Sequence, residues 1–148
     1  MPRCVSQEAK CGRWEPGVVL GPTDPAHVKE WVASYQKVYT DGSYPSARTW
    51  FGYAGLHSLG LGVTKAKSIE SVSVAKALEG LVLPPEIKLQ PNNVYFRARD
   101  HQLMSSEFPG EISQDGVYPN LFKVAEIVPG EKIALPEEQT GCKLDYAT

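Results

Sequence analysis

The side chains that most often carry chemistry are sparse in this sequence and far apart. The three histidines, His27, His57 and His101, form no i, i+4 pair with an intervening carboxylate, which is the spacing a helical metal site needs. The Gly60–Gly62 run lacks the third glycine of a dinucleotide-binding loop and lies within a helical pattern. There is no GxSxG nucleophile elbow either. The sequence therefore favours a protein with no metal, no cofactor and no catalytic residue.

Arg48 and Trp50 are the best candidates for binding a small molecule. They follow a proline turn and stand at the start of an expected helix. A helix N-terminus offers unpaired N–H groups and the positive end of a dipole, which suit a carboxylate, and an aromatic ring could line a small cleft. The alternative is that Trp50 belongs to the core and Arg48 is solvated.

The cysteines, Cys4, Cys11 and Cys142, fit neither a zinc pattern nor a CxxC redox motif. They are either incidental free thiols or include a disulfide from Cys142 to Cys4 or Cys11. A disulfide would indicate an oxidising compartment.

The elements that position these residues can be predicted from apolar periodicity and breakers. The expected order is strand, three helices, two strands and a polar tail from Glu131. The strands are expected at 17–22, 94–98 and 121–128, and the helices at 25–41, 47–65 and 71–79. Asp24 is the expected N-cap of the first helix, with Pro25 at its first position.

The second expected helix is apolar all around its cylinder, so we expect neighbours to bury it on every side. Its glycines lower helix propensity but permit close approach of another backbone. Three helices and a few short strands do not complete a sheet. The chain is therefore expected to be a fragment, and to oligomerise or be molten by itself.

Composition excludes some functions. The chain has 148 residues, 22% of them charged, and a net charge of −2 without a Lys/Arg run, so nucleic acid is not an expected partner. No window approaches 18 uninterrupted apolar residues. The N-terminus has no apolar region of a secretory signal, so the chain is either cytoplasmic or a piece of a secreted protein.

Several strings together resemble a known family, the type I periplasmic solute-binding proteins of the Leu/Ile/Val-binding class, which are receptors of ABC transporters. The resemblance covers roughly residues 15 to 145 and the last third of the family's length. The most specific strings are Ala75–Leu81 (AKALEGL) and Phe96–Gln102 (FRARDHQ). The chain departs from the family in the proline-rich stretch 84–93 and in residues 1–14, which match nothing.

The resemblance implies a partial α/β fold built from pieces of two lobes. Residues 15–23 and 108–148 would belong to the second lobe, and residues 24–107 to the first. Crossovers between the lobes would fall at 21–24 and near 100–108.

The resemblance also implies a function without catalysis. The expected solute is an amino acid or a related aromatic or aliphatic carboxylate, the expected partner is the membrane permease of an ABC transporter, and the expected compartment is the periplasm. Arg48, Thr49 and Trp50 would face the solute, and Cys142 would pair with Cys11. The alternative function is a ligand-sensing receptor domain of the same fold, in which closure signals; a small cytoplasmic enzyme is a third, weaker hypothesis.

Overall fold

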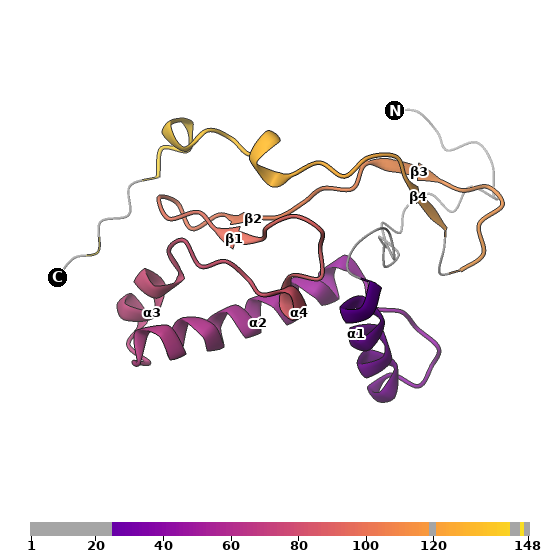
Figure 1. Ribbon diagram of the computed structural model, residues 1–148, viewed down its shortest axis with the longest axis horizontal. Coiled ribbons are helices and arrows are strands. Elements are labelled where there is room, and N and C mark those ends of the chain that lie inside the picture. Colours follow the sequence, from indigo (N-terminus) through magenta and orange to yellow (C-terminus); the bar gives the residue numbers. More distant parts are fainter. Residues whose placement is uncertain (1–24, 119–120, 143–145, 147–148) are drawn as a thin grey trace, which may run out of the picture.

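The computed structural model describes residues 25–118, 121–142 and 146 (Figure 1). Three helices dominate it: α1 (Pro25–Val38), α2 (Ala47–Ala66) and α3 (Ser71–Leu78). These confirm the three predicted helices. The predicted strand at 17–22, the Asp24 cap and the unmatched residues 1–14 lie outside the described residues.

The strands are short and pair antiparallel in two separate ribbons. β1 (Tyr95–Phe96) pairs with β2 (Leu103–Met104), and β3 (Gly110–Ile112) pairs with β4 (Phe122–Val124). The described chain thus has a mixed α/β composition without a larger sheet. The tail contains two 3-10 turns, η1 (Gly130–Lys132) and η2 (Glu137–Gln139).

The core lies where α1, α2 and the one-turn helix α4 (Pro85–Lys88) meet. Its members are apolar side chains from these helices and from the segments before β1. They are Val28, Val32, Trp50, Ala54, Leu83, Ile87, Leu89 and Val94. α4 was not predicted, because Pro84 and Pro85 indicated a break. Pro85 instead stands in the first turn of α4, where a missing N–H costs nothing.

α1 ends at Val38, short of the predicted end near Gly42. Val38 and Tyr39 are exposed, so a further helical turn would gain no stabilisation from packing on the core. The Asp41 carboxylate instead accepts the backbone N–H of Ser43 at 2.9 Å, and Gly42 has a φ of +79°. Both features stabilise a turn in place of the helix.

α2 packs on one side only, which makes the expectation of burial on every side wrong. Its inward row is Trp50, Ala54, Ser58 and Gly62, mostly small residues. A Cβ at Gly62 would come within 3.0 to 3.2 Å of Leu78 and Val74, so the glycine lets α3 approach closely. The opposite side of α2 exposes Phe51, Leu56 and Leu59. No helix among the described residues is long and apolar enough to span a membrane.

Two chain segments connect the helical part to the β3–β4 ribbon. The segment after β2 and the segment after β4 run antiparallel, and Glu107 and Val128 exchange two backbone hydrogen bonds of 2.9 Å (Figure 1). The tail then continues from Pro129 alongside β2, where Gly130 lies against the Ser105 backbone.

Candidate functional site

The turn into α2 is held by a capping box. Ser46 Oγ accepts the N–H of Thr49 at 3.3 Å, and Thr49 Oγ1 accepts the N–H of Ser46 at 3.1 Å. This reciprocal pair satisfies two backbone donors and fixes where the helix begins. The Thr49 hydroxyl, predicted to face a solute, is therefore engaged with the cap in this structure.

Trp50 and Arg48, adjacent to Thr49, have opposite surroundings. Only 7% of the Trp50 surface is exposed, and its indole Nε1 donates to the carbonyl of Ile87 at 3.1 Å. Arg48 is exposed. The structure thus places the predicted binding residues next to one another but directs Trp50 into the core. The ligand-binding role of the three stays a prediction.

The chain between β3 and β4 comes back to this same turn. Tyr118 Oη accepts the backbone N–H of Tyr44 at 3.1 Å, and the two rings meet edge to face with centroids 5.5 Å apart. Tyr44 lies two residues before the N-cap of α2. The ribbon and the chain before α2 therefore meet at Tyr44, although Tyr44 and Tyr118 are 74 positions apart in the sequence.

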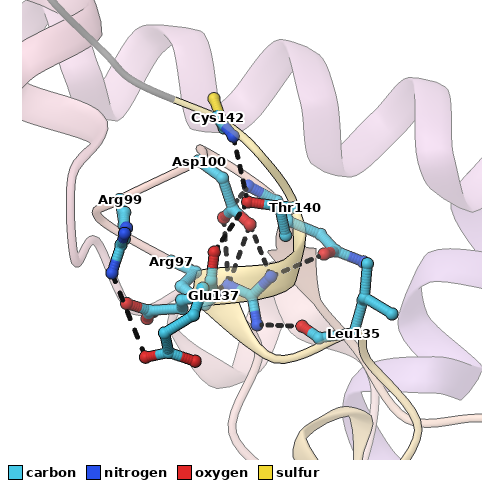
Figure 2. Close-up of polar contacts among 9 residues, drawn as sticks. Arg97, Arg99, Asp100, Leu135, Glu137, Thr140 and Cys142 are labelled. Atoms are coloured by element: carbon cyan, nitrogen blue, oxygen red, sulfur yellow. Dashed lines mark hydrogen bonds and ion pairs between the residues drawn. The ribbon is translucent and has the colours of Figure 1, made fainter.

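A second polar centre surrounds Arg97, just after β1 (Figure 2). Its guanidinium pairs with both carboxylate oxygens of Asp100 and donates to the Leu135 carbonyl at 2.9 Å. It also donates to Gln102 Oε1 at 3.0 Å. These hydrogen bonds with Arg97 hold the pKa of Asp100 below its usual value. Arg97, Arg99 and Asp100 alternate at the end of a predicted strand, a pattern that by itself predicts a salt-bridged strand end. The pairing of Arg97 with Asp100 confirms this prediction.

The Arg97 side chain also holds the polar tail that begins at Glu131. The Leu135 carbonyl comes from the tail, and Glu137 Oε1 lies 3.9 Å from the guanidinium. Contacts with Asp100, Gln102 and Leu135 engage Nε and both terminal nitrogens of this buried guanidinium. Its arrangement is that of a structural cross-link.

Glu79, His101 and Tyr146 form a third cluster that sequence reasoning missed. Tyr146 Oη lies 3.1 Å from Glu79 Oε1 and 2.9 Å from His101 Nε2, and the His101 nitrogen lies 3.3 Å from the same carboxylate oxygen. Lys76 Nζ lies 5.3 Å from the centre of the Tyr146 ring. No periodicity joins these residues, because Tyr146 is 45 positions from His101 and 67 from Glu79.

The electrostatics of this cluster do not suit base catalysis by the phenol. Burial raises the pKa of Tyr146, and its hydrogen bond to the Glu79 carboxylate raises it further. The phenol therefore stays protonated at neutral pH and donates to Glu79. The cluster attaches the end of the described chain to the C-terminus of α3.

Cys142 is half-buried, and its backbone N–H donates to Thr140 Oγ1 at 3.3 Å (Figure 2). Cys11, its predicted partner, lies outside the described residues, so the disulfide stays a prediction. Within residues 25–118, 121–142 and 146, no group of three or more His, Cys, Asp or Glu side chains could hold a metal ion.

A hollow of about 130 Å³ lies between β2 and η1. Its lining includes Met104, Ser105, Gly130 and Ile133. Enclosed sites for small organic ligands are usually at least about 300 Å³, so this hollow suits water better than an amino acid.

No protein-family model matches the chain, and a search of curated proteins finds no significant match.

Proposed function

We infer that this chain is the C-terminal part of an extracytoplasmic solute-binding protein that serves an ABC transporter. The proposal starts from the resemblance in the strings at 75–81 and 96–102. Its solute is an amino acid or a related small carboxylate, and its macromolecular partner is the membrane permease. The corresponding fold is a partial type I periplasmic-binding-protein fold.

The observation that carries the proposal is the double connection at Glu107 and Val128. A receptor that closes around its solute needs two bodies joined by a few chain crossings that can bend. Here the helical part and the β3–β4 ribbon are joined by two adjacent segments; Pro129 directly follows Val128, and Pro109 stands two residues after Glu107. The pairing of Glu107 with Val128 holds the two segments together between the helical part and the ribbon.

The contact between Tyr118 and Tyr44 marks where the two bodies would meet when the receptor closes. It brings the ribbon to the turn that carries Arg48, which is exposed at the N-terminal end of a capped helix. The guanidinium and the dipole of α2 both favour a carboxylate there. A solute bound at this point would stabilise the closed arrangement by its higher affinity for it.

The test is calorimetry on the full protein encoded by the gene, including any residues upstream of Met1. The ligands are leucine, valine, phenylalanine and benzoate. We expect at least one of them to bind with a micromolar or lower Kd, and Arg48→Ala to weaken that binding roughly tenfold, as expected for loss of one charge-assisted contact.

Arg99→Ala is the matched control, because Arg99 is also exposed and forms an ion pair with Glu138 at 3.9 Å, away from α2. It should leave affinity unchanged. Absence of binding by all four ligands, with no receptor-like sequence upstream, would overturn the proposal. Binding by a protein fused to a signalling domain would instead support the sensing role.

A further inference from the structure

The outward side of α2 is an exposed apolar surface made of two neighbouring rows. Exposed fractions are 53% for Phe51, 72% for Leu56 and 51% for Leu59. No charged residue lies between Arg48 and Lys65. Contiguous apolar surface of this kind on a helix indicates a contact with another body. The first row is Phe51, Gly55 and Leu59, and the second is Gly52, Leu56 and Gly60; together we call them the α2 face.

The three glycines of the α2 face are not needed for packing within the described chain. A Cβ added at Gly52, Gly55 or Gly60 would meet no atom within 4 Å. Glycine weakens a helix relative to alanine, so three of them on one exposed face carry a cost that internal packing does not explain. Gly62, on the inward row, is different because α3 fills the space beside it.

The rows are complementary to themselves under one symmetry. Successive residues of a helix are separated by about 100°, so the first row lies about 100° and the second about 200° from the inward row. A partner helix that contacts both rows approaches from the direction midway between them. A two-fold axis parallel to α2 sets the first row of one copy against the second row of the other at nearly equal height. Every large side chain then meets a glycine: Phe51 meets Gly52, Leu56 meets Gly55, and Leu59 meets Gly60 of the second copy.

The antiparallel arrangement lacks this match. A two-fold axis perpendicular to α2, centred between residues 55 and 56, sets Phe51 against Leu59 and Leu56 against its own copy. Large side chains then meet each other while the glycines face one another across gaps. Small residues opposite large ones allow two helix backbones to approach closely, and only the parallel pair has this pattern throughout.

We propose that the α2 face is the interface of a parallel homodimer of this chain. The face exposes on the order of 400 Å² in each copy, so the pair would bury less than a standard specific interface and in the range of a weak, transient contact. A weak dimer is therefore expected, with a Kd inside the concentration range of the test below. The Phe51 ring also contacts the Trp50 ring, with centroids 5.0 Å apart. The inference does not rest on the proposed function, because it uses neither Arg48 nor the contact between Tyr118 and Tyr44.

Sedimentation velocity of the full chain, between about 5 µM and 1 mM under reducing conditions, tests the proposal. The wild type should shift from monomer to dimer across that range. Gly55→Leu fills the space that receives Leu56 and should raise the dimer Kd at least tenfold. This variant separates specific packing from general adhesion, because it adds apolar surface and favours the helix, so a merely adhesive face would associate more strongly.

Leu56→Ala should weaken the dimer in the same direction. Ile112→Ala is the matched control, since Ile112 is an exposed apolar side chain on β3, away from the α2 face; it should leave the dimer Kd unchanged. Circular dichroism on each variant verifies that it is folded.

Three results would overturn the proposal: a monomer at every concentration, stronger association of Gly55→Leu, or equal weakening by Ile112→Ala. If the chain is monomeric and the thiol introduced by Leu56→Cys does not react with a labelling reagent, another segment of the same chain covers the α2 face. None of these results bears on solute binding, so failure here is distinguishable from failure of the receptor proposal.

Discussion

Trp50 gives the sharpest test of how the helices pack, through the variant Trp50→Phe. The indole is almost fully buried and donates to the carbonyl of Ile87 in α4. Phenylalanine cannot make that hydrogen bond, whose net loss costs about 1 kcal/mol. The smaller ring also leaves part of the site empty, at about 1 kcal/mol more. We therefore expect the free energy of unfolding to fall by about 2 kcal/mol.

Urea unfolding followed by far-ultraviolet circular dichroism measures this loss without relying on tryptophan fluorescence. Tyr53→Phe is the matched control: it lies on the same helix, and its hydroxyl donates to the carbonyl of Glu86 at 3.1 Å in an exposed position. Water replaces an exposed hydrogen bond, so the control should cost less than about 0.5 kcal/mol. Equal midpoints for Trp50→Phe and the wild type would refute the packing. If that variant instead lost only solute affinity in the full protein, Trp50 would be the cleft wall that the sequence predicts.

Two further predictions concern α2 and the acid response. Gly62→Ala should lower the free energy of unfolding by about 1 kcal/mol, because Leu78 and Val74 must move. Gly52→Ala has open space around it and should raise the free energy of unfolding by about 1 kcal/mol through helix propensity. Urea midpoints at low micromolar protein concentration measure both effects, and stabilisation by Gly62→Ala would contradict the close approach of α3. Arg97 lowers the pKa of Asp100, and the N–H groups of Val72 and Ser73 lower the pKa of Glu70. Both carboxylates therefore stabilise the fold fully at neutral pH. This stabilisation is lost as the pH falls through their folded-state pKa values, below about 4. The melting temperature should therefore drop by several degrees below pH 4. Asp100→Asn should have a lower melting temperature than the wild type at pH 7 but lose less of it on acidification. If acidification lowered the melting temperature of this variant as much as that of the wild type, the stabilising role of the Arg97–Asp100 pair would be contradicted.

The sequence predicted the helices well because their signals are local. Ser46 and Thr49 form the cap of α2 within three residues of each other. Gly80, whose type marks a helix end in the sequence, follows α3 with a φ of +68°. α4 was missed because it has a single turn, which leaves no periodicity to read, and because a Pro-Pro pair indicates a break more often than a start.

The polar centres could be predicted only where their partners are close in sequence. Arg97 and Asp100 are three positions apart, and their pairing was expected. The Leu135 carbonyl and Tyr146 reach their partners across 38 and 45 or more positions, where spacing carries no information. For the same reason the sequence predicted a polar tail from Glu131 but not its attachments at Arg97 and Glu79.

The error on α2 has a physical explanation that also bears on its function. A helix with apolar residues all around was predicted to be buried all around, because hydropathy treats every apolar position alike. Yet below Trp50 the inward row contains only small residues, Ala54, Ser58 and Gly62, whereas the outward rows contain Phe51, Leu56 and Leu59 between glycines. The small residues bring α3 close, whereas the large ones are left on the outside. The all-round pattern is therefore the sum of two surfaces, one completed within the chain and one that requires a second body. Side-chain size, considered together with hydropathy, distinguishes these two surfaces. Small residues form the row that packs within the chain, and large residues alternate with glycines in the two rows that face a second body.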